Sequence, residues 1–199
     1  MPSRLKDLEI YAVLRKKELL SHLEEQPSTT EDRLDKKESK VIFGIDPGTR
    51  VTGYGVIRVT PFGIEPVDFG AIRPPPDLPL PERHRILFES LESLVAHFQP
   101  DALAVETQFV YKNVQSALKL GMVRGVALLA AARRGLPIYE YAPRKAKLAV
   151  VGTGAASKEQ VQKMVQLLLR LPHPPEPEDA ADALALAICH SNTLNRRGF

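Results

Sequence analysis

The order of strand-like and helix-like segments after residue 40 constrains the fold of this chain more than any other feature. Short runs rich in β-branched and apolar residues predict strands at 41–45, 54–59, 64–72, 102–105 and 138–141. Apolar residues at helical spacing predict helices at 82–98, 114–134, 143–150, 157–170 and 178–194. Three strands followed by alternating helices and strands indicate an α/β fold, with a five-stranded mixed sheet and helices on both faces.

The first 40 residues differ in composition from the rest of the chain. They hold nine Lys and Arg and nine Asp and Glu, so the net charge of +3 lies entirely in 41–199. We expect an N-terminal extension over 1–40, made of an amphipathic helix and a charged linker, one domain over 41–195 and a short tail over 196–199. The helix either folds back, frays or binds a partner, and the sequence leaves these alternatives open.

Composition indicates in which cellular compartment the protein acts and which class of partner it binds. A single cysteine, Cys189, excludes an internal disulfide, and charged residues occupy the place of a signal peptide. The longest apolar run, over 126–132, is far short of the roughly 20 residues that span a bilayer. We therefore expect a cytoplasmic protein with no membrane partner, and the mild basic excess suits nucleic acid.

Four acids stand where folding alone gives little reason for them. Asp46 and Glu106 follow the first and fourth predicted strands, and Asp179 and Asp182 lie one turn apart at the start of an Ala- and Leu-rich helix. A turn residue, a solvated strand end or a charge at a helix N-terminus would explain the first three separately. Asp182 is harder to explain, because it lies inside an apolar helix on the same face as another carboxylate.

A cluster of carboxylates is suited to metal-assisted hydrolysis of phosphodiesters. Like charges near 4 Å apart repel by about 4 kcal/mol at an effective dielectric of 20, so such a site needs a cation or shared protons. Mg²⁺ prefers oxygen ligands, and two ions can activate water and stabilise the leaving oxygen. His173 and His190 are the nearby imidazoles, and both are expected to be surface or cap residues.

The local sequences around these acids resemble the RuvC-type Holliday junction resolvases over about 41–195. Residues 44–57, Gly-Ile-Asp-Pro-Gly-Thr-Arg-Val-Thr-Gly-Tyr-Gly-Val-Ile, are similar to the opening motif of that family. The segments similar to its other motifs are 106–109 with 112–113 and 116–121, then 150–152 with Lys158, and finally 179–185. Typical members of the family lack an extension like 1–39, so the resemblance says nothing of that segment.

The resemblance implies a ribonuclease H-like fold and a homodimer that nicks two opposed strands of a four-way DNA junction symmetrically, in recombination and repair. It also implies that Asp46, Glu106, Asp179 and Asp182 are the catalytic, metal-binding acids. About two Mg²⁺ ions per site are expected, with Mn²⁺ as a substitute. The RuvAB branch-migration complex is the partner that the family works with.

Several residues are candidates for DNA contact. Phe109 follows the second acid and is suited to stacking on bases, as the resemblance supports, whereas Tyr111 is the weaker candidate. The polar and basic candidates for phosphate contact are Lys112, Asn113, Arg144, Lys147 and Lys158. Each could instead be a core cap or a solvated charge, although Lys158 can also assist catalysis electrostatically.

Gly121 and Gly125 in the helix over 114–134 allow close approach of another element. That element is either the sheet of the same chain or a second copy, and the resemblance favours the two-fold interface.

Three other functions remain to be weighed. An ATPase of the actin and sugar-kinase type shares the first motif, but it needs a second domain and a second Gly-rich loop that 199 residues do not supply. A silent nucleic-acid-binding relative would keep the fold without cutting. A ribonuclease acting on RNA–DNA hybrids would use nearly the same chemistry, because groove shape and 2′-hydroxyl contacts decide the substrate.

Overall fold

The computed structural model of this chain describes residues 39–107 and 114–195. Most of the predicted extension over 1–40 and the predicted tail over 196–199 therefore lie outside the described residues, and both stay predictions. The same holds for Phe109, Tyr111, Lys112 and Asn113. All the structural statements below concern the described part of the chain.

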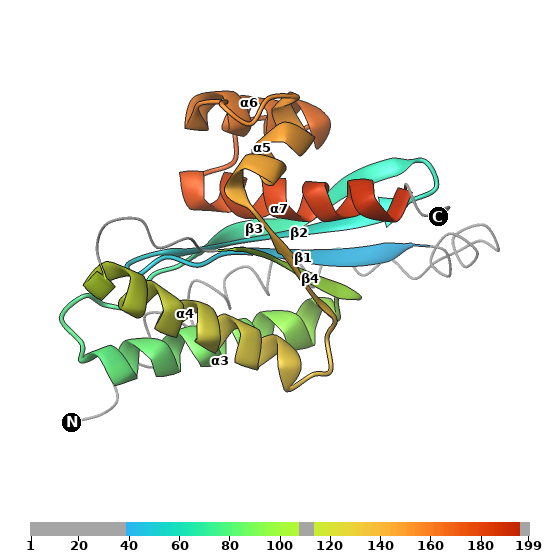
Figure 1. Ribbon diagram of the computed structural model, residues 1–199. Helices are drawn as coiled ribbons and strands as arrows, with labels where there is room; N and C mark the ends of the chain where they lie inside the picture. The colour runs from blue at the N-terminus through green and yellow to red at the C-terminus, as the bar shows by residue number, and fades with distance from the viewer. Residues whose placement is uncertain (1–38, 108–113, 196–199) are drawn as a thin grey trace. The chain divides into compact units, whose positions relative to one another are not determined.

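A five-stranded mixed sheet forms the centre of the fold, which confirms the prediction (Figure 1). Its strands are β1 (Lys40–Asp46), β2 (Thr52–Thr60), β3 (Gly63–Ile72), β4 (Ala102–Glu106) and β5 (Ile138–Tyr141). The spatial order is β3-β2-β1-β4-β5, with β1 antiparallel to β2, β2 antiparallel to β3, and β1, β4 and β5 parallel. β1 is therefore the central strand, and one end of it adjoins the end of β4.

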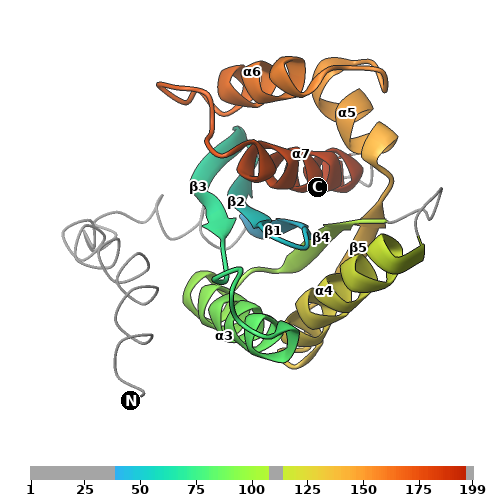
Figure 2. The ribbon, with the colours of Figure 1, turned by 90° about the vertical axis from the view of Figure 1, so that its left-hand side faces the viewer.

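Helices cover both faces of this sheet. They are α3 (Leu80–Phe98), α4 (Val114–Ala132), α5 (Pro143–Val151), α6 (Lys158–Leu168) and α7 (Glu178–Asn195). Figure 2 shows α3 and α4 side by side under one face, and α7 against the other face with α5 and α6 outside it. Helix α7 therefore lies between the sheet and an outer helical layer.

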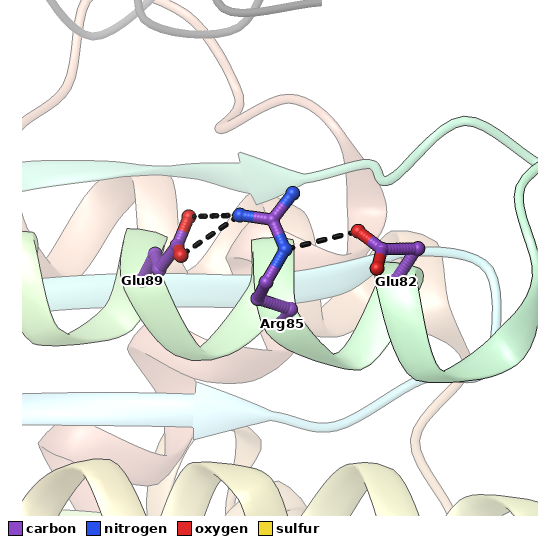
Figure 3. Close-up of polar contacts among 3 residues, drawn as sticks. All are labelled: Glu82, Arg85 and Glu89. Atoms are coloured by element: carbon purple, nitrogen blue, oxygen red, sulfur yellow. Dashed lines mark hydrogen bonds and ion pairs between the residues drawn. The ribbon is translucent and has the colours of Figure 1, made fainter. Parts of the chain in front are cut away.

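Local chemistry explains where these helices begin and end. A capping box begins α6, since the Ser157 hydroxyl accepts from the Gln160 amide and the Gln160 side chain accepts from the Ser157 amide. Pro143 begins α5, and Gly152, with a φ of 82°, ends it in the left-handed conformation. On the exposed side of α3, Arg85 pairs with Glu82 at 2.9 Å and with Glu89 at 2.7 Å (Figure 3). Such exposed pairs contribute little to helix stability, because water and salt screen them.

Alternation along β1 divides the core into two clusters. Ile42 belongs to the cluster under α5, α6 and α7, whereas Phe43 and Ile45 belong to the cluster over α3 and α4. In β4, Leu103 and Ala104 divide in the same way. Successive strand residues point to opposite faces, so the sheet separates two mainly apolar layers.

Helix α4 ends two residues before the predicted limit and has one buried side. Val123, Ala127, Ala130 and Ala131 are buried, while much of the opposite side is exposed. By length and composition alone, this is the one helix among the described residues that could cross a membrane. Packing of its buried side against the domain explains the apolar composition equally well.

Candidate active site

As predicted, Asp46 and Glu106 are the last residues of their strands, and the structure shows that these strands are parallel neighbours. The strands β1 and β4 are paired in parallel up to the residues directly before these acids. Asp46 lies two residues after Gly44, which faces α7, and Glu106 lies two residues after Ala104 in the core cluster under α7. Because alternate residues share a face, both carboxylates lie on the α7 side of one sheet edge.

Glycines in the sheet let α7 approach closely enough to bring its own acids to this edge. A methyl group on Gly53 would lie 2.9 Å from Cβ of Asp179 and would collide with its backbone carbonyl. A methyl group on Gly44 would collide with the carbonyl oxygen of Ala183. The helix therefore rests directly on the backbone of β1 and β2, and Asp179 and Asp182 lie over the ends of the strands.

The four acids are close enough to influence one another electrostatically. Burial, followed by Glu106, Asp182 and Asp179, raises the pKa of Asp46 from 3.8 to about 7, against a smaller lowering by Lys158. A carboxyl group with this pKa is partly protonated near neutral pH. Its ionised form is disfavoured by lost hydration and by three other acids, and a cation would relieve both costs.

Glu106 and Asp182 share this environment. Burial, followed by Asp182, raises the pKa of Glu106 to about 6, against a lowering by Lys147 and Lys158. Burial also raises the pKa of Asp182, again against the two lysines, while Asp179 adds to the rise. Two acids on the sheet and two on α7 therefore act on one another as a single electrostatic unit.

Two of the predicted basic residues lie beside the cluster. The Lys158 ammonium at the start of α6 is 3.8 Å from Oδ2 of Asp182 and 3.4 Å from Oε2 of Glu178. Lys147 on α5 is half-buried, and its ammonium donates to the carbonyl oxygen of Ala156 at 2.7 Å. The structure therefore brings Lys147 and Lys158 to the edge where the acids gather.

The structure places only one of the other predicted DNA contacts, because the rest lie outside the described residues. Arg144 is exposed near the start of α5, on the same helix as Lys147. Phe109, Lys112 and Asn113 fall in the segment between β4 and α4 that lies outside the described residues. Their predicted roles therefore stay predictions.

The donor chemistry of the cluster fits a hard divalent cation. Each of the four side chains offers carboxylate oxygens, the ligands that Mg²⁺ and Mn²⁺ prefer. As they stand, no three His, Cys, Asp or Glu side chains of the described residues are close enough to ligate one ion. Repulsion between ionised carboxylates favours wider spacing of the acids than a bound cation would impose.

His190 corrects an expectation from the sequence. It was expected at the surface or at a helix cap, but it is only 1% exposed, and the Tyr141 hydroxyl is 2.6 Å from its Nδ1. Helix α7 is covered on both sides, so a polar residue in its second half must find a buried partner. The apolar composition around the whole helix was the signal for this burial. His173, by contrast, is exposed as expected.

Sequence reasoning missed two arginines that hold the backbone close to the acids. Arg83 on α3 donates from its guanidinium to the carbonyl oxygen of Thr49, in the turn after Asp46, at 2.5 Å. Arg124 on α4 donates from Nε to the carbonyl oxygen of Glu106 at 3.3 Å. Neither contact could be read from the sequence, because each joins segments that only the tertiary structure brings together.

The mixed sheet, its two helical layers and the four acids at one edge define a ribonuclease H-like nuclease. The family model described as "Crossover junction endodeoxyribonuclease RuvC" matches residues 42–190. The chain is 63% identical to a protein of that name from Protochlamydia amoebophila over 151 residues, which cover 76% of this chain and 90% of the relative. It is 53% identical to the one from Chlamydia pneumoniae, over 77% of this chain and 94% of the relative.

Solved structures give the same result. Thermus thermophilus RuvC is 34% identical, with a TM-score of 0.71 over 79% of this chain and 96% of that one. A second structure of that protein, also with a TM-score of 0.71, is in complex with a Holliday junction substrate. This chain belongs to the RuvC family of crossover junction endodeoxyribonucleases.

Proposed function

We propose that this protein is a Holliday junction resolvase, an endonuclease that nicks two opposed strands of a four-way DNA junction symmetrically in recombination and repair. The observation that carries the proposal is its membership of the RuvC family together with the gathering of four acids at one sheet edge. The complex of a 34% identical relative with a Holliday junction substrate supports the choice of substrate.

The proposed catalytic residues are Asp46, Glu106, Asp179 and Asp182, which would hold Mg²⁺, about two ions per site, with Mn²⁺ as a substitute. Bound there, the metal supplies charge for water activation and for the leaving oxygen. The raised pKa of Asp46, about 7, supports this role. A bound cation would offset both the hydration that burial removes and the repulsion from the neighbouring acids. Asp179 and Asp182 supply the α7 side of the site, and Asp46 and Glu106 supply the sheet side.

Basic and aromatic residues around this edge would hold the junction. Lys158, Arg144 and Lys147 are the proposed phosphate contacts on α5 and α6, and their charges act without regard to base sequence. Lys158 is 58% exposed in its side chain, so a phosphate can reach it while it remains beside Asp182. Phe109, Lys112 and Asn113 are the proposed contacts in the segment before α4, with Phe109 stacking on or between bases.

The exposed side of α4 supports a homodimer. Val114, Leu118, Met122 and Leu129 are 67%, 61%, 52% and 54% exposed, which is unusual for apolar residues on one helix. A methyl group on Gly121 or Gly125 would meet nothing within 4 Å in the described chain, so these glycines do not serve packing against the sheet. Of the two alternatives, the two-fold interface is therefore proposed, since paired nicks need two active sites.

Sedimentation of Leu118→Glu tests this interface. We expect wild type to sediment as a dimer at micromolar concentration and Leu118→Glu as a folded monomer, because burying an unpaired charge opposes association. Leu167→Glu, at a similarly exposed leucine on α6, is the matched control and should remain dimeric. A wild-type monomer would contradict the interface.

Cooperation with RuvAB and a cytoplasmic location complete the proposal and rest on the family.

Cleavage of a synthetic four-way junction tests the proposed reaction. Wild type, Asp46→Asn and Asp77→Asn are compared with Mg²⁺ and with EDTA, alongside an RNA–DNA hybrid of equal length. Asp77 is exposed in the loop before α3 and serves as the control for loss of a carboxylate. We expect paired symmetric nicks that require metal, disappear in Asp46→Asn with junction binding retained, and persist in Asp77→Asn.

Other outcomes would each replace the proposal. Junction binding without cutting by wild type would indicate a silent binding protein. Cutting of the hybrid in preference to the junction would indicate a ribonuclease of the same fold.

A further inference from the structure

Arg124 connects helix α4 to the end of the strand that carries Glu106. Its Nε donates to the carbonyl oxygen of Glu106 at 3.3 Å, and its Nη2 lies 2.6 Å from Oε2 of Glu140 on β5. The side chain is only 22% exposed, compared with 47% for Glu140. A guanidinium presents several donors in a rigid plane, so one arginine can hold two acceptors on neighbouring strands at once.

The part of α4 that carries Arg124 is packed against the core. Val123, directly before Arg124, and Ala127, three residues after it, are 4% and 0% exposed and belong to the core under the sheet. The guanidinium therefore projects from a part of α4 that is fixed to the domain. The other side of the same turn carries Met122 and Gly125, which are exposed on the proposed dimer side.

The end of β4 is also held by β5, since Glu106 pairs with Tyr141 in the parallel ladder. β4 ends at Glu106, and beyond it the Thr107 amide donates to the carbonyl oxygen of Tyr141 at 2.8 Å. The position of the Glu106 backbone determines where its carboxylate lies. A shift of the strand end therefore moves this carboxylate relative to Asp46 and α7. Lys147 and Lys158 are the cations that lower the pKa of Glu106, whereas Arg124 contacts its backbone.

We infer that Arg124 is a positioning residue, which fixes the end of β4 so that Glu106 meets the other three acids in a geometry able to bind metal. Arg124 thereby couples α4, the helix of the proposed dimer interface, to the end of β4 that carries Glu106. The inference rests on the proposed function in treating Glu106 as a metal-binding acid.

Arg124→Gln tests the inference, since glutamine keeps helix propensity but loses the charge and the reach. Hydrogen exchange of the full chain is followed in peptides covering 103–107, and Mn²⁺ binding is measured by calorimetry. We expect faster exchange in these peptides, Mn²⁺ binding weaker by about tenfold, and a lower single-turnover rate with unchanged junction affinity, since residues that orient metal ligands typically contribute about 10–100-fold. Glu140→Gln removes only the ion pair and should give the same changes at smaller size.

Arg133→Ala is the matched control. Arg133 follows the same helix and pairs with Glu92 on α3 at 2.8 Å, away from the strand ends. Unchanged exchange and Mn²⁺ binding in Arg124→Gln, or equal changes in Arg133→Ala, would overturn the inference. If Arg124→Gln does not fold, Glu140→Gln decides in its place by the same two measurements. Wild type that binds Mn²⁺ but leaves junctions uncut would refute the proposed function, while the exchange result still decides the role of Arg124.

Discussion

Replacing Asp46 by Asn should stabilise the metal-free protein, although it should abolish cleavage. Burial and three neighbouring acids raise the pKa of Asp46 from 3.8 to about 7. Between these values the folded protein holds a proton that the unfolded chain has lost, so the stability of wild type falls as pH rises through this window. Asn has nearly the same shape and carries no charge, so the variant escapes this loss.

The size of the effect follows from the same pKa. A rise from 3.8 to about 7 corresponds to about 4 kcal/mol above pH 7 at 1.36 kcal/mol for each pH unit. Water entering around the ionised group reduces this value, because effective dielectric constants in proteins are nearer 20 than 4. We expect Asp46→Asn to exceed wild type by about 2 kcal/mol in EDTA at pH 8, and the difference to shrink towards zero near pH 4.

Urea titrations in EDTA at pH 8 and pH 4 provide the assay, at one protein concentration and with Asp77→Asn as the control. Saturating Mg²⁺ provides a second comparison, because a ligand that binds only the folded state stabilises it by about 2.7 kcal/mol at 100 times its Kd. That gain should appear in wild type and be much smaller in Asp46→Asn. An Asp46→Asn protein no more stable than wild type at pH 8 in EDTA would refute the reasoning about the buried cluster.

Three further predictions concern metal binding and packing. Mn²⁺ affinity should rise from pH 6 to pH 8, because the pKa values of Asp46 (about 7) and Glu106 (about 6) mean that metal binding displaces protons; calorimetry that finds no pH dependence would contradict this. Gly53→Ala should lower the free energy of unfolding by about 2 kcal/mol or more, because the methyl group meets the backbone of Asp179; a urea midpoint equal to that of wild type would count against it. Tyr141→Phe should cost about 1–3 kcal/mol, because it removes the contact of 2.6 Å between the Tyr141 hydroxyl and Nδ1 of the buried His190, with Mn²⁺ binding unchanged as the check on its purely structural role.

The strands and the acids at their ends were predictable because the signals are local. A β-branched run followed by Asp-Pro-Gly predicts a strand and its end within a few residues, and β1 ends at Asp46 as predicted. The same holds for β4 and Glu106. The four motifs in their order also indicated the RuvC family, which the comparisons confirm.

His190 shows where local reasoning failed. The sequence around it is almost entirely apolar, and such a helix is covered on all sides rather than along one stripe. The structure places α7 between the sheet and the α5–α6 layer, so His190 is buried against Tyr141. The signal was present, but the partner is 49 residues away and could not be named from the sequence.

The sequence by itself determined the residue types, their strand and helix positions, and the family of this protein. Only the tertiary structure decided which acids face one another, how far burial raises the pKa of Asp46, and which side chain holds the backbone of Glu106. Asp46 lies near the start of the domain's sequence and Asp182 near its end. They come close together because glycines in β1 and β2 let α7 rest on the sheet. Electrostatic energy and desolvation depend on distance and burial in three dimensions, and these are set by packing between segments far apart in the chain.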